Sequence, residues 1–314
     1  MRRTKAHRHE RTKGKDQGIL HFVPASLRAS VPVLILLFLS GCAMSEQDEI
    51  ELGRKVHVQF EQEFGGRYGD ADVQQYVNSV GMGMARYAGR PNLDWQFHVL
   101  NSDQINAFAV PGGYIYVTKG LLFRLSNEAQ LAGVLGHEAG HIEHRHSVKQ
   151  IQRAQTVGIG ATVIGIVASV FGYGGVGDLA NVVGQLTLMK YGRGQEQEAD
   201  YSGLEYMTQA GYDPRGIVQT MQVLQQAAGS GGPEWMSSHP NPGNRIEYLN
   251  DAIDKKYSSH VGTGRMGEEA FQQVVGQPVA MMRIDWSQPS MWCLTCRLKE
   301  SQQKNRPSAA ALSN

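Results

Sequence analysis

Residues 127–148 read NEAQLAGVLGHEAGHIEHRHSV and contain the motif His-Glu-x-x-His. Because side chains four residues apart share one face of a helix, the two histidines of the motif, His137 and His141, can bind the same metal ion. A helically spaced apolar face runs along the same stretch and consists of Leu131, Val134, Leu135 and Ile142. The stretch therefore predicts a helix that carries a metal site, with the rest of the domain built around it.

Glu138 follows the first histidine, where its carboxylate can accept a proton from the water that attacks a substrate. The alternative is a surface helix with two solvated histidines. A hydrolytic zinc site usually has three protein ligands, so a third is expected downstream. Glu196 and Asp200 lie one turn apart on a predicted helix. Glu196 would bind zinc and Asp200 would orient a ligating histidine, although both acids could also belong to an ordinary charged helix face.

Patterning and turn residues predict the other elements. Asn127 followed by Gln130 predicts a capping box that opens the metal-site helix. The other expected helices are residues 47–64, 71–87, 213–228 and 241–253. A strand at 95–99 is followed by two apolar strands, 106–109 and 114–118, which flank Pro111-Gly112-Gly113 and predict a hairpin. The chain is thus expected to be α+β and mainly helical.

Four stretches carry a resemblance to one protein family. In chain order they are NAFAVPGGYIYVTKGLL at 106–122, the stretch at 127–148, EQEADYSG at 196–203 and SHPNPGNR at 238–245. They resemble the HtpX-like and CAAX-prenyl-type zinc endopeptidases, gluzincins in which the third zinc ligand is a glutamate. The soluble bacterial branch of lipoprotein proteases is the most similar. The resemblance covers residues 47–255 and implies a metalloprotease domain in which a small sheet or hairpin borders the cleft.

The resemblance implies a role for each motif residue. His137, His141 and Glu196 match the ligands of one zinc ion per subunit. Glu138 matches the general base, and Asp200 matches the acid that orients a ligand.

Downstream, the family's His-Pro and arginine positions match His239 and Arg245. By resemblance these side chains lie near the cleft and are suited to stabilising an oxyanion. His239 could instead fill the open coordination position of zinc and hold the enzyme latent. In a third reading, His239 begins a turn and Arg245 is a solvated helix residue. His144 and His146 do not have the four-residue spacing from the ligands, so we expect them beside the site or on the surface.

A substrate-binding strand is also implied by the resemblance. In gluzincins an edge strand above the zinc helix pairs with extended substrate, and main-chain pairing of this kind makes little demand on sequence. The matching residues are Asn106, Ala107, Phe108 and Ala109. The hairpin could also serve only to cover the helix.

The N-terminal part predicts export and lipidation. Residues 1–41 contain eight Lys or Arg and two acids, followed by the apolar run at 31–39, which is typical of a signal peptide and short for a membrane span. Leu39-Ser40-Gly41-Cys42 resembles a lipobox, so lipidated Cys42 is expected to anchor the protein through the linker at 42–46. Ala43 favours the periplasmic side of the outer membrane. An ordinary cleaved signal peptide with an incidental cysteine is the alternative.

Beyond residue 41 the chain holds 22 basic and 27 acidic residues, against a net charge of +1 for the whole sequence. Nucleic-acid binding needs a basic surface, so this acidic balance argues against it. One metallopeptidase domain is expected at 47–260, and a partly disordered C-terminal extension at 261–314. That extension contains Cys293 and Cys296, which would be an oxidised pair or of no consequence in an exported protein.

Residues 154–177 contain no charged side chain and seven glycines. The glycines make a membrane-spanning helix unfavourable. We expect an apolar lid or helical hairpin that covers the cleft or rests against the membrane, with a buried core helix as the alternative.

Together these features predict an envelope zinc endopeptidase that hydrolyses unfolded or misassembled exported proteins, in outer-membrane quality control. The alternative is a chaperone or assembly scaffold for outer-membrane proteins with a latent zinc site. The complete set of ligands and Glu138 favours catalysis, because a scaffold needs neither a base nor an open coordination position.

Overall fold

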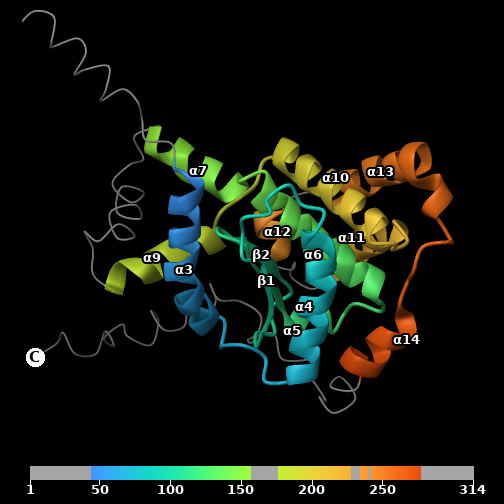
Figure 1. Ribbon diagram of the computed structural model, residues 1–314, viewed down its shortest axis with the longest axis horizontal. Coiled ribbons are helices and arrows are strands. Elements are labelled where there is room, and N and C mark those ends of the chain that lie inside the picture. The colour runs from blue at the N-terminus through green and yellow to red at the C-terminus, as the bar shows by residue number, and fades with distance from the viewer. Residues whose placement is uncertain (1–43, 157–175, 228–233, 240–241, 277–314) are drawn as a thin grey trace, which may run out of the picture. The chain divides into compact units, whose positions relative to one another are not determined.

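The computed structural model describes residues 44–156, 176–227, 234–239 and 242–276 (Figure 1). The sheet has the strand order β1-β3-β2, formed by Gln96–Leu100, Tyr114–Thr118 and Ala107–Val110 respectively. β2 and β3 pair antiparallel, which confirms the predicted hairpin, whereas β1 pairs parallel with β3. The turn between β2 and β3 needs glycine, because Gly112 and Gly113 have φ values of +87° and +102°. In the strand order β1-β3-β2, β2 is an edge strand.

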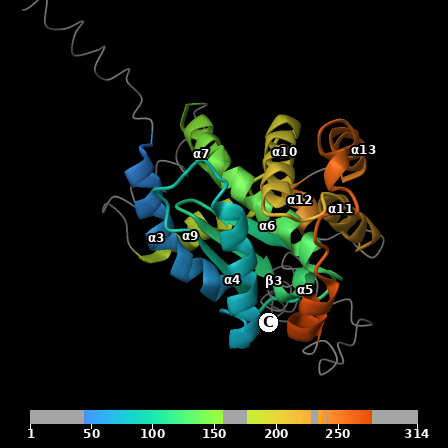
Figure 2. The same cartoon turned by 45° about the vertical axis from the view of Figure 1, so that its right-hand side comes forward.

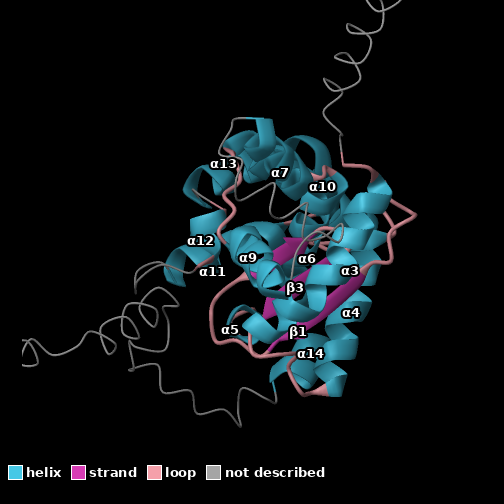
Figure 3. Cartoon of the chain, turned by 90° about the vertical axis from the view of Figure 1, so that its left-hand side faces the viewer, coloured by secondary structure: helices cyan, strands magenta, loops and turns pink. Residues whose placement is uncertain are grey.

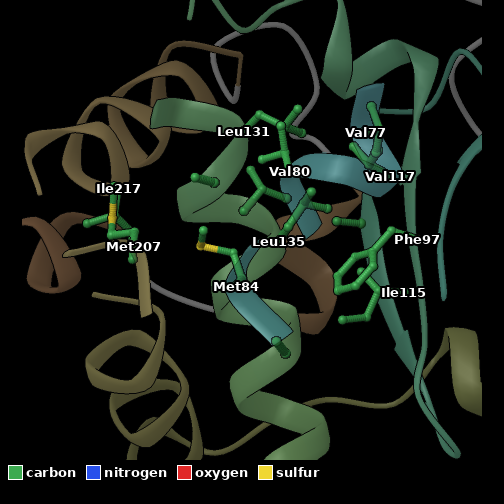
Figure 4. Close-up of a cluster of buried hydrophobic side chains, with 14 of the residues drawn as sticks. Val77, Val80, Met84, Phe97, Ile115, Val117, Leu131, Leu135, Met207 and Ile217 are labelled. Atoms are coloured by element: carbon green, nitrogen blue, oxygen red, sulfur yellow. The ribbon is translucent and has the colours of Figure 1, made fainter. Parts of the chain in front are cut away.

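Helices cover both faces of this sheet. Because successive side chains of a strand point to opposite faces, β3 divides its residues between two apolar clusters. Ile115 and Val117 face α4 (Ala71–Ala85) and the metal-site helix α6 (Glu128–Glu143), as Figure 4 shows. Tyr114 and Tyr116 face α3 (Glu46–Glu63) and α9 (Val176–Thr187). The sheet, which is magenta in Figure 3, thus lies between two helical layers.

α6 is the central helix of the domain, and nearly all of its residues are buried. It packs most extensively against α10 (Arg193–Gln209), and also against α11 (Arg215–Ala227). Glycines set the distance between α6 and α10, because a Cβ atom on Gly203 would lie 2.8 Å from the backbone nitrogen of His137. In Figure 2, α10, α11 and α12 lie to one side of α6, and α3 and α9 lie to the other. The fold thereby holds the metal-site helix against its downstream partner at short range.

The remaining helical elements are short or lie at the border of the domain. They are α5 (Lys119–Leu122), α7 (His146–Thr156), α12 (Trp235–Ser238), α13 (Pro242–Ala252), α14 (Glu268–Phe271), two π-helical segments (Ile253–Tyr257 and Gln272–Gly276) and a 3-10 turn (Ser258–His260). The mainly helical α+β class expected from the sequence is confirmed.

The predicted capping box at the start of α6 differs from the standard form. Asn127 caps α6, as expected, by accepting a hydrogen bond from the backbone nitrogen of Gln130 at 2.9 Å. The side chain of Gln130, however, accepts from the backbone nitrogen of Ser126 at 2.7 Å, one residue before the cap. The cap is therefore shifted by one residue from a standard reciprocal box.

Several expectations fall on residues outside the described ranges. They concern the signal peptide at 1–41, Cys42, most of the apolar segment at 154–177, and the extension with Cys293 and Cys296. Within the described ranges, no helix has the length and hydropathy needed to cross a bilayer.

Candidate active site

Four buried side chains from three elements converge next to α6. The Nε2 atoms of His137 and His141 lie 3.0 Å apart on α6. Glu196 of α10 brings its carboxylate oxygens to 3.8 and 3.5 Å from those two nitrogens. His239, directly after α12, places Nδ1 at 3.2 Å from Nε2 of His137 and 3.0 Å from Oε1 of Glu196. One donor atom from each residue lies within 4.8 Å of all the others, which is the nitrogen and oxygen donor set that zinc prefers.

Glu138 has no exposed surface, and within the described ranges neither of its carboxylate oxygens has a hydrogen-bond partner. Nε2 of His239 lies 3.7 Å from its Oε1. Burying a carboxylate without partners is costly, so such a group calls for a ligand that the protein itself does not supply. A metal ion with its water would supply that partner, so the residues present fit a hydrolytic zinc centre.

A buried hydrogen-bond network orients two members of the donor set, His137 and Glu196. Nδ1 of His137 donates to Asp200 at 2.9 Å. Arg245 donates to both oxygens of Asp200, at 2.8 and 2.6 Å, and to Oε2 of Glu196 at 2.6 Å. Tyr248 also donates to Asp200. Burial alone would raise the pKa of Asp200, but the charges of Arg245 and His137 outweigh it and lower that pKa to about 2. In this arrangement Arg245 orients ligands from behind the donor set.

The charges around the site shift the pKa of Glu196 and that of His239 in opposite directions. Burial opposes ionisation of Glu196, but His239 and Arg245 lower its pKa well below the usual range. Burial also opposes protonation of His239, yet Glu196 and Glu138 together raise its pKa. The cluster therefore holds the carboxylate ready to bind a cation.

Behind His141 stands a second chain of contacts. Nδ1 of His146, the first residue of α7, lies 2.8 Å from Nδ1 of His141, and its Nε2 lies 3.0 Å from Oε2 of Glu198. Burial lowers the pKa of His146 to about 4, so the ring is neutral at pH 7. His144 instead contacts Oγ of Ser202 at 2.9 Å. Neither histidine belongs to the donor set.

Two aromatic rings that were not among the predicted site residues, Trp235 and Tyr191, contact the donor set. Trp235 stacks on His239 with ring centroids 4.6 Å apart, and Tyr191 stacks on His141 at 4.0 Å. The hydroxyl of Tyr191 pairs with Ser147 at 2.9 Å. Trp235 stands four residues before His239, a helical spacing that could have signalled the contact. Tyr191 stands five residues before Glu196, outside α10, so no helical spacing relates it to that ligand.

The expected substrate-binding strand lies beside the donor set. Ala107, Phe108 and Ala109 of β2 line one cavity with His239, the end of α9 and Tyr191. Asn106 precedes the strand, where its side chain accepts from the backbone nitrogen of Ala107 at 3.0 Å. The cavity measures about 20 Å³, which is room for roughly one water molecule. In this conformation the strand is thus covered on its active-site side.

Comparison with known proteins agrees with this geometry. The model of peptidase family M48 matches residues 71–253. The chain is 31% identical to the beta-barrel assembly-enhancing protease of Yersinia pestis over 56% of its length and 38% of that protein. It is 33% identical to the mitochondrial metalloendopeptidase OMA1 of Arabidopsis thaliana, over 57% and 36% of the two chains, and to that of Schizosaccharomyces pombe, over 59% and 55%. The chain thus spans about half or less of each relative. The resemblance seen in four motifs is confirmed, and the chain belongs to peptidase family M48.

Proposed function

We propose that this protein is a zinc-dependent endopeptidase of the bacterial cell envelope that hydrolyses peptide bonds in unfolded or misassembled exported proteins. One observation carries the proposal, namely the buried carboxylate of Glu138, which has no hydrogen-bond partner among the described residues and lies beside a complete donor set. A purely structural metal site needs no such group, because its ligands alone satisfy the ion.

His137, His141 and Glu196 would hold the ion. When bound, zinc would polarise the substrate carbonyl and make water more acidic. Glu138 accepts a proton from the attacking water and then delivers it to the nitrogen of the broken C–N bond. Asp200 keeps the proton of His137 on Nδ1, which leaves the lone pair of Nε2 free to hold the ion.

Substrate would bind as an extended segment along β2. As an edge strand, β2 can pair with a further strand through main-chain hydrogen bonds, which suits a protease that recognises exposed backbone rather than sequence. Because the present cavity has room for only about one water molecule, the end of α9 and Tyr191 must move before a peptide enters. Unfolded chains then have an advantage over folded ones, since they supply extended segments.

His239 supports a latent resting state. Its Nδ1 occupies the position of a fourth donor, where substrate and water would otherwise approach the ion. The same observation favours the second candidate function, a chaperone or scaffold for outer-membrane proteins whose zinc site stays closed. Glu138 distinguishes the two, because only catalysis needs its unpartnered carboxylate.

For location, we propose export by the signal peptide at 1–41 and attachment through lipidated Cys42 to the periplasmic side of the outer membrane. A relative named for beta-barrel assembly supports outer-membrane proteins as the clients.

The test compares casein cleavage and zinc content in the mature protein, Glu138→Gln and Glu143→Gln. Glu143 lies on the same helix, where its carboxylate accepts from the backbone of Gly89, and glutamine preserves that bond. We expect Glu138→Gln to keep zinc and lose cleavage by about a hundredfold or more, and Glu143→Gln to behave as the unchanged protein. Cleavage by Glu138→Gln would refute the mechanism. Zinc without cleavage in all three would favour the scaffold.

A further inference from the structure

The two metal-site histidines of α6 are supported in different ways. His137 donates from Nδ1 directly to a carboxylate, that of Asp200. Among the residues that the structure describes, no carboxylate contacts Nδ1 of His141, which instead faces Nδ1 of His146 at 2.8 Å. The ring of His146 continues to Glu198, with Nε2 at 3.0 Å from Oε2.

Only one arrangement of protons satisfies this chain. Nε2 of His141 belongs to the donor set, so the proton of that neutral ring is on Nδ1. It can be donated only if Nδ1 of His146 carries a lone pair. The proton of His146 is then on Nε2, from which it is donated to the carboxylate of Glu198. All the hydrogen bonds run outward, from the metal site toward the carboxylate.

An unusual turn makes this contact possible. α6 ends at Glu143, and Arg145 adopts φ = 54°, the only positive φ at a non-glycine residue in the described ranges. Such a conformation costs about 1 kcal/mol or more outside glycine. It is held by hydrogen bonds from Arg145 to Glu49 at 2.7 Å and to the carbonyl oxygen of Met44 at 2.6 Å. The reversal returns His146 to the metal-site helix five residues after His141.

Burial indicates which part of the chain matters most. The side chain of His146 is fully buried, whereas 56% of the Glu198 side chain is exposed. The bond between the two histidines is therefore shielded from water, while the outer ion pair competes with solvent.

We propose that His146 is a positioning residue for the metal ligand His141, which it connects to the carboxylate of Glu198. The zinc centre then has one histidine backed directly by a carboxylate and one backed through a second histidine. Such partners fix the tautomer and orientation of a ligand, and their loss typically weakens metal binding ten- to a hundredfold. The proposal rests on zinc binding by the donor set but does not depend on which substrate is cut.

Two variants separate positioning from mere packing. In His146→Asn, the amide oxygen can take the place of Nδ1 and still accept from His141. In His146→Gln, the amide nitrogen can take the place of Nε2 and keep Glu198, but no acceptor faces His141. Zinc affinity is measured by competition with a chromophoric chelator, and the melting temperature of each metal-free protein reports folding. Glu198→Gln serves as a third variant.

We expect His146→Gln to lose zinc affinity by about ten- to a hundredfold, and His146→Asn to retain most of it. Glu198→Gln should lose less than His146→Gln. Equal affinity in His146→Gln and the unchanged protein would overturn the proposal. The proposal would also be overturned if His146→Asn and His146→Gln lost zinc affinity equally and in proportion to the fall in their metal-free melting temperatures, because packing alone would then account for both losses. Absence of zinc binding in the unchanged protein would instead refute the metal site itself.

Discussion

Gly203→Ala tests whether the spacing of α6 and α10 controls the metal site. A Cβ atom at this position would lie 2.8 Å from the nitrogen and 3.2 Å from the Cα of His137, and 3.0 Å from the carbonyl carbon of Gly136. All three are backbone atoms, so no side chain can rotate away. Ordinary carbon contacts begin near 3.5 Å. The two helices must therefore separate by roughly half an ångström.

This displacement has different consequences for folding and for metal binding. Overpacking costs about 1–3 kcal/mol, and replacing a helical glycine with alanine returns about 1 kcal/mol. We therefore expect the free energy of unfolding to fall by about 0–2 kcal/mol, which most domains survive. Metal–ligand distances tolerate only about 0.2 Å. Since Glu196 lies on the displaced helix, zinc affinity should fall by about tenfold or more.

The assay combines chelator competition with urea unfolding of the metal-free protein. Gly83→Ala in α4 is the matched control, because its added Cβ would have no described atom within 4 Å apart from the backbone of its own helix. It should leave zinc affinity unchanged and stabilise the fold by up to about 1 kcal/mol. If Gly203→Ala binds zinc as tightly as the unchanged protein, the reasoning from helix spacing is wrong.

Three further results are expected. His239→Ala should retain zinc through the other three ligands and cleave casein faster, because the fourth position opens; slower cleavage with full zinc content would indicate a catalytic role instead. In metal-free protein, the Asp200 pKa of about 2 stabilises the fold by about 2 kcal/mol above pH 4, and this contribution should disappear as pH falls from 4 to 2. Urea unfolding across that range should show that the difference in free energy of unfolding between the unchanged protein and Asp200→Asn becomes smaller. A constant difference would contradict the lowered pKa of Asp200. Zinc added to the metal-free protein should raise the melting temperature with concentration, and Glu196→Gln should reduce that rise; equal rises would argue against Glu196 as a ligand.

Much of the fold was predictable from local signals. Apolar patterning and N-terminal capping residues located α3, α4, α6, α11 and α13 within a few residues. The Pro111–Gly113 turn predicted the hairpin through its backbone requirements. The parallel pairing of β1 with β3 was not predictable in this way, because it joins segments that no tight turn connects.

The site shows the same division. His137 and His141 were placed by helical spacing, and Glu196 by its motif, and the structure brings all three together. The roles of Tyr191 and of the contact from His146 to Glu198 depend on how distant segments pack, and no local pattern encodes that. His146 in particular faces the site only because the backbone reverses at the preceding residue.

The residues that match the family are fewer than the residues that the domain needs in order to fold. The family match begins at residue 71, yet the α3 side chain of Glu49 holds the backbone reversal that presents His146. α3 also covers the sheet face that carries Phe108 and Tyr116. A fragment cut at the family boundary would expose that face to water and release the reversal. The autonomous folding unit therefore begins at or before residue 46, and any chimaera or truncation of this protein has to carry α3 with the metal-site helix.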